Sequence, residues 1–256
     1  MYIKKIFKKI QRNLFKKKNN KKSEGKLIPD MNRPIGDFNL LFKELRRKGL
    51  ICNFILDVGA HSSEWIRTAM KAYPEATVYL IEPLEEMEDK LKQFCRDFPK
   101  SKYFLNGAGA KEENLLLTLS GVLEGANFLE NKSNHLRSVN KQREVKIITI
   151  DSLIEKKEIE IPDMVKLDIQ GFELEALKGA SLLFGKTEVF ILEVSFFEFI
   201  KGTPIFSDVI RFMSDRGYEA YDFPSFLRRP FDNALGQIDI CFVKRNGYLR
   251  SSDDWQ

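Results

Sequence analysis

Two acidic residues lie at the ends of neighbouring apolar runs, and their placement indicates a site for an adenosine-containing ligand. Asp57 lies near the end of the run 54–58, just before a turn that contains Gly59, and Glu82 ends the next run. Doubly wound sheets bind ligands at the carboxyl ends of such strands, where an acid on the second strand can accept hydrogen bonds from both ribose hydroxyls. Gly59 would let the backbone approach the ligand, and Asp57 could accept hydrogen bonds from a ligand ammonium group.

The glycine pattern separates two ligand classes that both contain a ribose. A dinucleotide needs the second and third glycines of GxGxxG for its pyrophosphate, and this chain has His61 and Glu64 in their places. S-adenosylmethionine has no phosphate and makes no such demand. The sequence therefore favours S-adenosylmethionine over a nicotinamide dinucleotide.

A third acid, Asp168, ends the predicted strand 163–168 at the same edge of the sheet. Gly171 permits a tight exit from that strand. A helix follows from residue 172, with Leu174 and Leu177 facing the core, and the motif indicates that it ends at Gly179. Glu173 can serve the site or simply favour the helix dipole, and the sequence leaves both readings open. Because a hydroxyl acceptor benefits from a general base, Asp168, Glu193 and His61 are the candidate catalytic residues.

Short apolar, β-branched runs alternate with helical patterns from residue 54 onward, which predicts βαβ units around a parallel sheet. Two loop prolines near the chain end predict a final antiparallel pair. We expect strands at 54–58, 77–82, 102–106, 145–150, 163–168, 188–194, 218–222 and 237–243. We expect helices at 38–48, 63–73, 84–97, 172–184 and 204–216.

The sequence resembles the FkbM family of methyltransferases across about residues 54–243. The resemblance is carried by Asp57 to His61, Ile81 to Pro83, Thr149 to Leu153, Lys166 to Ala180 and Ile191 to Val194, in that order along the chain. It implies an α/β, class I methyltransferase (Rossmann-like) fold, doubly wound, with a mostly parallel seven-stranded sheet, helices on both faces and a terminal antiparallel strand. It also implies S-adenosylmethionine as methyl donor and a hydroxyl acceptor, commonly on a sugar or polyketide.

The resemblance assigns roles to individual positions. The methionine end of the cofactor would be lined by Asp57, Gly59, Ala60 and His61, the ribose by Glu82 with Pro83, and the adenine by Asn106 and Ala108. Asp168 would lie beside the transferring methyl group. Ser63 stands where the family usually has a second glycine, and since serine is a good helix N-cap we expect it to be tolerated.

The long segment 120–144 contains two glycines and two asparagines, and it is too long for a simple connection. We expect it to form part of a lid over the acceptor. His135, within it, is an outside candidate for the site and is more readily interpreted as a solvated loop histidine.

Charge divides the chain into two parts. The net charge is +5, yet residues 1–22 hold ten Lys or Arg and no acid, so the remainder is acidic overall. An acidic body is a poor surface for nucleic acid. Ile3, Phe7, Ile10 and Leu14 recur at helical spacing among the basic residues. This segment is either a basic amphipathic helix on an anionic membrane or a solvated extension.

We therefore expect an N-terminal extension and linker over 1–26 and a methyltransferase domain over 27–256. The three widely spaced cysteines predict a reduced, cytoplasmic protein, which could also lie peripherally at the inner face of the membrane. Since no residues have a convincing metal-ligand spacing, we expect no metal. The partner would be a small-molecule or glycan acceptor rather than nucleic acid. The rivals are a membrane-associated adaptor that has lost cofactor binding and a nucleic-acid methyltransferase.

Overall fold

The computed structural model describes residues 36–119, 125–128 and 142–254. The basic segment 1–26, His135 and most of the predicted lid segment lie outside these ranges, so the predictions made for them stay predictions. None of the helices within the described ranges has the length and apolar character needed to cross a bilayer.

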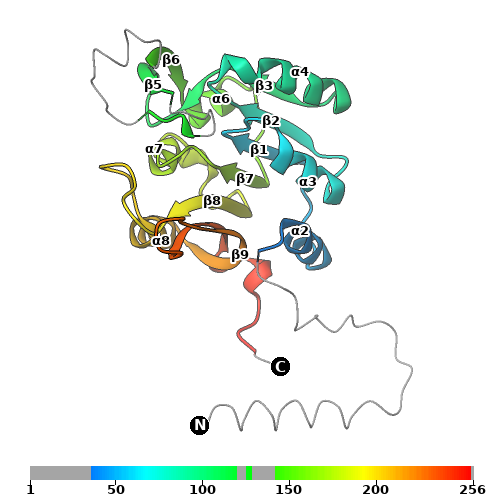
Figure 1. Cartoon of the computed structure of the whole chain (residues 1–256). Coiled ribbons are helices and arrows are strands. Elements are labelled where there is room, and N and C mark those ends of the chain that lie inside the picture. Colours follow the sequence, from blue (N-terminus) through cyan, green and yellow to red (C-terminus); the bar gives the residue numbers. More distant parts are fainter. Residues whose placement is uncertain (1–35, 120–124, 129–141, 255–256) are drawn as a thin grey trace, which may run out of the picture. The chain divides into compact units, whose positions relative to one another are not determined.

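A seven-stranded sheet forms the centre of the domain, in the order β3-β2-β1-β7-β8-β10-β9 (Figure 1). Neighbouring strands from β3 to β8 run parallel, whereas β10 runs antiparallel to both β8 and β9. The doubly wound, mostly parallel sheet and its final antiparallel pair are thus confirmed. The strands are β1 (Phe54–Val58), β2 (Thr77–Ile81), β3 (Lys102–Phe104), β7 (Met164–Leu167), β8 (Val189–Ser195), β9 (Tyr218–Arg228) and β10 (Leu235–Lys244).

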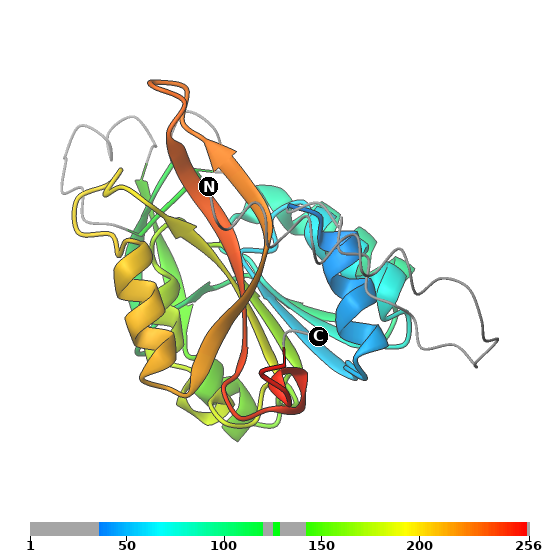
Figure 2. The same cartoon turned by 90° about the horizontal axis from the view of Figure 1, so that it is seen from below.

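Helices cover both faces of this sheet (Figures 1 and 2), because successive strand residues point to opposite sides. Ile55 of β1 packs in one core with the first set of helices, and the next residue, Leu56, packs in the other core with the second set. The first set is α2 (Phe38–Arg47), α3 (Glu64–Ala72) and α4 (Glu88–Asp97), the last entered through the 3-10 turn η1 (Glu85–Met87), and the second is α6 (Ile150–Glu155), α7 (Glu173–Lys178) and α8 (Phe206–Ser214).

The helical periodicity over 172–184 is wrong in its second half, whereas the helix end expected at Gly179 is confirmed, because Gly179 is the C-cap of α7. Helix α7 ends at Lys178, and the separate 3-10 turn η3 (Ser181–Leu183) follows. Gly179 packs so closely against Gly109 that an added Cβ would lie 2.1 Å from the Gly109 carbonyl oxygen. This contact, which sequence periodicity does not reveal, fixes where the helix stops.

A second, three-stranded sheet was not predicted. It has the order β4-β6-β5, formed by β4 (Gly107–Ala108), β5 (Glu113–Thr118) and β6 (Gln142–Ile148). The predicted strand 145–150 therefore belongs to this sheet and ends early, because Thr149 caps helix α6 by accepting a hydrogen bond from the Ser152 amide at 3.0 Å. Strand β5 is rich in leucine, which favours helix, so its pairing with β6 decides its conformation.

Candidate active site

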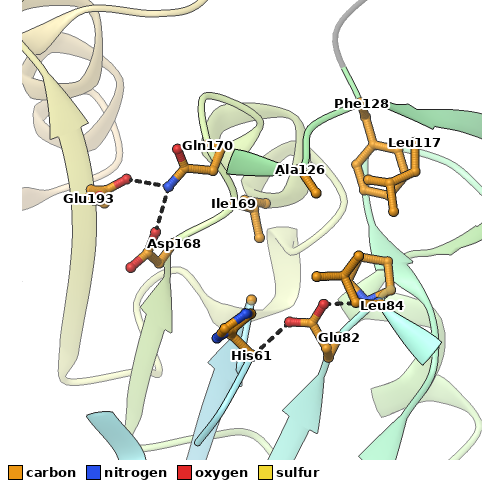
Figure 3. Close-up of a pocket in the computed structure, with 12 residues that line it drawn as sticks. His61, Glu82, Leu84, Leu117, Ala126, Phe128, Asp168, Ile169, Gln170 and Glu193 are labelled. Carbon is orange, nitrogen blue, oxygen red and sulfur yellow. Dashed lines mark hydrogen bonds between the residues drawn. The ribbon is translucent and has the colours of Figure 1, made fainter. Parts of the chain in front are cut away.

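A pocket of about 270 Å³ opens at the carboxyl ends of the parallel strands (Figure 3). This volume lies just below the ordinary range for ligand sites, about 300–1,000 Å³, and the pocket is open on one side. Its wall within the described residues consists of Gly59, His61, Glu82, Pro83, Leu84, Leu117, Ala126, Phe128, Asp168, Ile169, Gln170 and Glu193. Residues from β1, β2, β7 and β8 thus meet at one place, as expected for this edge of the sheet.

Glu82 is held rigidly at the end of β2. It is buried, and its two carboxylate oxygens accept backbone hydrogen bonds from His61 N at 2.7 Å and from Leu84 N at 2.9 Å (Figure 3). Burial raises the pKa of Glu82 to about 6, although these two bonds oppose the rise. Each oxygen can accept a second hydrogen bond, so the carboxylate keeps the capacity to bind two ribose hydroxyls.

The turn after β1 packs directly against the end of β7, in addition to bordering the pocket. Gly59 has a φ of +84°, and a Cβ there would lie 2.0 Å from the carbonyl oxygen of Asp168. Glycine is therefore required by the contact between the ends of β1 and β7, a reason the sequence did not reveal. Asp57 lies behind this turn, 2% exposed, and burial raises its pKa to about 7, with Lys166 opposing and Asp168 adding to the rise.

Ser63 does not behave as the helix cap that we expected. It occupies the N-cap position of α3, but its backbone is left-handed, with a φ of +61°, and its side chain makes no capping bond. The Ser63 hydroxyl oxygen is buried and has no hydrogen-bond partner among the described residues. The left-handed backbone explains why a glycine suits this position, and serine carries a cost in stability here.

Asp168 lies at the centre of a polar network that joins β7, β8 and β10. Lys166 Nζ contacts both Asp168 Oδ2 and Asp239 Oδ1 at 3.0 Å, and its side chain is only 4% exposed. Gln170 Nε2 donates to Asp168 Oδ1 at 3.2 Å and to Glu193 Oε2 at 2.9 Å (Figure 3). The Asp168 side chain remains 35% exposed, so this carboxylate is both fixed by its partners and accessible.

The two carboxyl groups bridged by Gln170 differ in their titration. Burial opposes charge on Asp168, but the positive charge of Lys166, together with hydrogen bonds from Lys166, Glu193 and Gln170, lowers its pKa. Burial and then the negative charge of Asp168 raise the pKa of Glu193 well above its ordinary value. The surroundings therefore favour the ionised form of Asp168 and the protonated form of Glu193. Environments that separate two carboxyl pKa values in this way are typical of acid–base sites.

Glu173 belongs to the frame of the site. It is buried, and its Oε1 accepts backbone hydrogen bonds from Ile169 at 2.9 Å and from Gly171 at 3.2 Å. Burial raises the pKa of Glu173 to about 7, against the effect of those bonds. Gln170 and Gly171 both have positive φ, so Glu173 stabilises the tight turn that presents Gln170 to its two partners. Glu173 thus binds the turn at the start of α7 and is not among the residues that line the pocket.

Most of the predicted site residues meet at this pocket. His61, Glu82, Pro83, Asp168 and Glu193 line it together with Gly59, while Asp57 and Ala60 are buried beside it. The cofactor and catalytic roles of these residues stay predictions.

Two positions predicted for the adenine do not reach the pocket. Asn106 donates its side-chain amide to the Lys146 carbonyl at 3.2 Å, and Ala108 is buried in β4. The chain enters the second sheet after β3, where Gly107, between these two residues, packs against Phe128 of the pocket wall. The adenine role of Asn106 and Ala108 stays a prediction.

The sequence reasoning also missed residues that complete the site. Gln170 lies within the recognised motif but received no role, and Gln237 Nε2 donates to Glu193 Oε2 at 3.1 Å. Gln237 reaches Glu193 only because β10 pairs antiparallel with β8, which no local pattern reveals. Ala126 and Phe128 form the opposite wall. They belong to the long segment 120–144, whose unusual length was the available signal.

The charge of the pocket fits the cofactor predicted from the sequence. The described lining includes the acids Glu82, Asp168 and Glu193 and no lysine or arginine. S-adenosylmethionine carries a sulfonium and an ammonium group, whereas a dinucleotide would bring a pyrophosphate against these acids. Within the described ranges, no group of three or more His, Cys, Asp or Glu side chains is arranged to hold a metal ion.

The fold is the Rossmann-like fold of class I methyltransferases, and the acidic pocket at its strand ends suits a positively charged cofactor. A sequence model of the Methyltransferase FkbM domain matches residues 57–220, and the chain belongs to this FkbM methyltransferase family. S-adenosylmethionine is the cofactor of this family. A comparison with curated proteins finds no match.

Several solved structures are similar to the chain. Methyltransferase FkbM from Methylobacillus flagellatus KT is 18% identical, with a TM-score of 0.46, over 73% of this chain and 43% of that protein. Magnesium protoporphyrin IX methyltransferase from Synechocystis PCC 6803 with bound S-adenosylmethionine is 13% identical, with a TM-score of 0.44, over 80% and 79% of the two chains. Aeropyrum pernix fibrillarin with S-adenosyl-L-methionine is 15% identical, with a TM-score of 0.43, over 78% and 73%.

Proposed function

We propose that this protein transfers the methyl group of S-adenosylmethionine to a hydroxyl group, most simply that of a sugar. The observation that carries the proposal is the bridge from Gln170 to the carboxyl groups of Asp168 and Glu193 at the pocket wall. A hydroxyl must lose its proton as it is methylated. Asp168 is the group available to accept it, while Glu193 in its protonated form can donate a hydrogen bond.

The neighbouring residues give Asp168 its charge and its direction. Lys166 neutralises one side of the carboxylate and Gln170 holds the other, so the exposed part points toward the pocket. S-adenosylmethionine supplies a methyl group already activated by the positive sulfur. Alignment of the acceptor oxygen with that group can then supply much of the acceleration. Because the lowered pKa makes Asp168 a weak base, its contribution belongs at the lower end of the 10²–10⁴-fold that general bases provide.

A second hollow supports a sugar as the acceptor. It has a volume of about 580 Å³ and shares Phe128 with the cofactor pocket. Phe172, whose ring centroid is 5.6 Å from that of Phe128, offers an apolar face, and the carboxylates of Glu175, Glu198 and Asp208 lie around it. Aromatic faces can pack on the C–H surface of a sugar while carboxylates accept hydrogen bonds from its hydroxyls.

Transfer of labelled methyl from S-adenosylmethionine to fractionated glycans, glycolipids and small metabolites of the source cell tests the proposal. We expect label in a glycan or glycolipid fraction, in a product stable to mild base as an ether is. The Asp168→Asn variant is the control for a chemical role. Label found only in nucleic acid, or in a base-labile ester, would contradict the proposed acceptor.

A further inference from the structure

Exposed apolar side chains gather at the open end of the β9–β10 hairpin and on the loop after β8. We call this the hairpin-end surface. Phe231, in the turn of the hairpin, is 89% exposed, and Leu227 is 61% exposed. Apolar groups gathered in this way mark an interaction site. The surface comprises Phe197, Phe199, Ile200, Phe226, Leu227 and Phe231.

Contacts across the two segments make the hairpin-end surface continuous. The Arg229 guanidinium lies 3.9 Å from the ring centroid of Phe197, on the loop, and 5.5 Å from that of Phe231, on the hairpin. Phe197 and Phe199 are themselves 5.7 Å apart between ring centroids. Figure 2 shows the hairpin projecting beyond the other strands of the sheet. The hairpin-end surface is therefore narrow and projects from the domain.

Three basic residues belong to the two segments that form the hairpin-end surface. Lys201, Arg228 and Arg229 accompany it, against the acids Glu198 and Asp232, of which Asp232 is paired with Arg229. Basic residues beside exposed aromatic and aliphatic groups are typical of segments that lie in a membrane interface, because their long side chains can reach the anionic headgroups.

The beginning of the domain lies against the same hairpin. The Gly36 amide donates to the Phe223 carbonyl at 3.1 Å, and a Cβ on Gly36 would lie 2.9 Å from the ring of Phe226. The preceding part of the chain, which lies outside the described residues, carries ten Lys or Arg and no acid in residues 1–22. The described part of the chain thus begins beside the apolar surface, and the polybasic segment precedes it in the sequence. Stable membrane attachment commonly needs two such signals, one apolar and one polybasic.

We propose that the hairpin-end surface inserts into the headgroup region of an anionic lipid bilayer. A second copy of the chain is a poorer occupant, because a stable dimer buries about 800 Å² on each partner and a narrow projecting turn offers little flat area. A bilayer deforms around such a turn.

The hairpin leads directly to the site. Gln237, near the start of β10, donates to Glu193 at 3.1 Å, and the Phe196 amide donates to the Gly236 carbonyl at 2.9 Å. Insertion of the hairpin would thus hold the strand-end side of the domain toward the lipid, and the acceptor would be a membrane-held molecule such as a lipid-linked sugar. This last step rests on the proposed function, whereas the docking does not.

Partitioning of the full chain onto vesicles tests the docking. The vesicles contain phosphatidylglycerol and phosphatidylcholine, with pure phosphatidylcholine for comparison. We expect the double variant Phe231→Ser with Leu227→Ser to bind the anionic vesicles at least about tenfold more weakly than the native chain. The matched control is Ile51→Ser, which removes an apolar side chain that is 72% exposed just before β1, at the other end of the strands, and should bind as the native chain does.

A tryptophan at the turn separates insertion from attraction by the basic segment alone. The full-length Phe231→Trp variant should gain fluorescence that brominated lipids quench, whereas the Ile51→Trp control should not. Thermal melting of every variant establishes that it is folded. The proposal would be overturned if the folded double variant partitioned onto vesicles as the native chain does, or if brominated lipids did not quench the Phe231→Trp variant. It would also be overturned if the native chain were a dimer and the double variant a monomer. S-adenosylmethionine binding by the same variants is measured separately, so loss of the proposed function cannot be mistaken for loss of docking.

Discussion

Replacing Ser63 with glycine should stabilise the protein, although serine is the residue that this chain uses. Relief of the left-handed backbone at Ser63 contributes about 1–2 kcal/mol, and the greater freedom of glycine in the unfolded chain offsets about 0.4–1 kcal/mol of it. Removing the buried hydroxyl, which lacks a partner, contributes about 1–3 kcal/mol. The net gain expected for Ser63→Gly is about 1–5 kcal/mol.

Urea unfolding followed by circular dichroism measures this gain, and two variants separate its parts. Ser63→Ala removes the hydroxyl but keeps the strained backbone, so it reports the hydroxyl alone. Lys157→Gly relieves a φ of +58° at an exposed side chain, so it reports the backbone alone. Since Ser63 does not line the pocket, cofactor affinity should be unchanged in Ser63→Gly. A Ser63→Gly protein less stable than the native chain would refute this reasoning.

Three further predictions concern the charges of the site. Lys166→Met should lower the free energy of unfolding at pH 7 by about 3–5 kcal/mol, measured in urea, since it leaves Asp168 and Asp239 without their buried cation; a change below about 1 kcal/mol would contradict the network. Asp168→Asn should lower the methylation rate about 10²-fold with little change in cofactor affinity, and a loss below about tenfold in single-turnover assays would make Asp168 a positioning residue. Burial raises the pKa of Glu82 to about 6, and the ribose favours the ionised form of this carboxyl group. The affinity for S-adenosylmethionine should therefore fall from about pH 7 to about pH 5, and binding near pH 6 should release protons. Calorimetry in buffers of different ionisation enthalpy measures both effects, and an affinity that stays constant over this range would contradict the prediction.

The central strands could be predicted from the sequence because strands buried on both faces consist of continuous apolar runs. Strands β1, β2, β7 and β8 are covered on both faces, so they read as short, continuous apolar runs with an acid at or just beyond the end. That pattern placed Asp168 and Glu82 at the pocket wall and Asp57 just behind it. Their shared edge follows from the parallel arrangement alone.

The parts that could not be predicted depend on contacts between distant segments. The second sheet forms because β5 pairs with β6 across a long stretch of chain, and it takes up Ala108, which the sequence did not place in any strand. Gln237 reaches Glu193 through the register of β10 on β8. The left-handed backbone of Ser63 has no local signature in serine itself. In each case a tertiary contact overrides or supplements local preference.

Calorimetry of S-adenosylmethionine with the native chain and with Glu82→Gln tests the central claim most directly. The account predicts saturable binding to the native protein. It also predicts binding weaker by about 1–3 kcal/mol, or roughly 5- to 150-fold, for the folded variant, because the ribose loses a charged acceptor. Glutamine keeps the side chain's shape and one acceptor oxygen for the turn. Absence of binding by the native protein at millimolar cofactor, or equal affinity of the two proteins, would contradict the account.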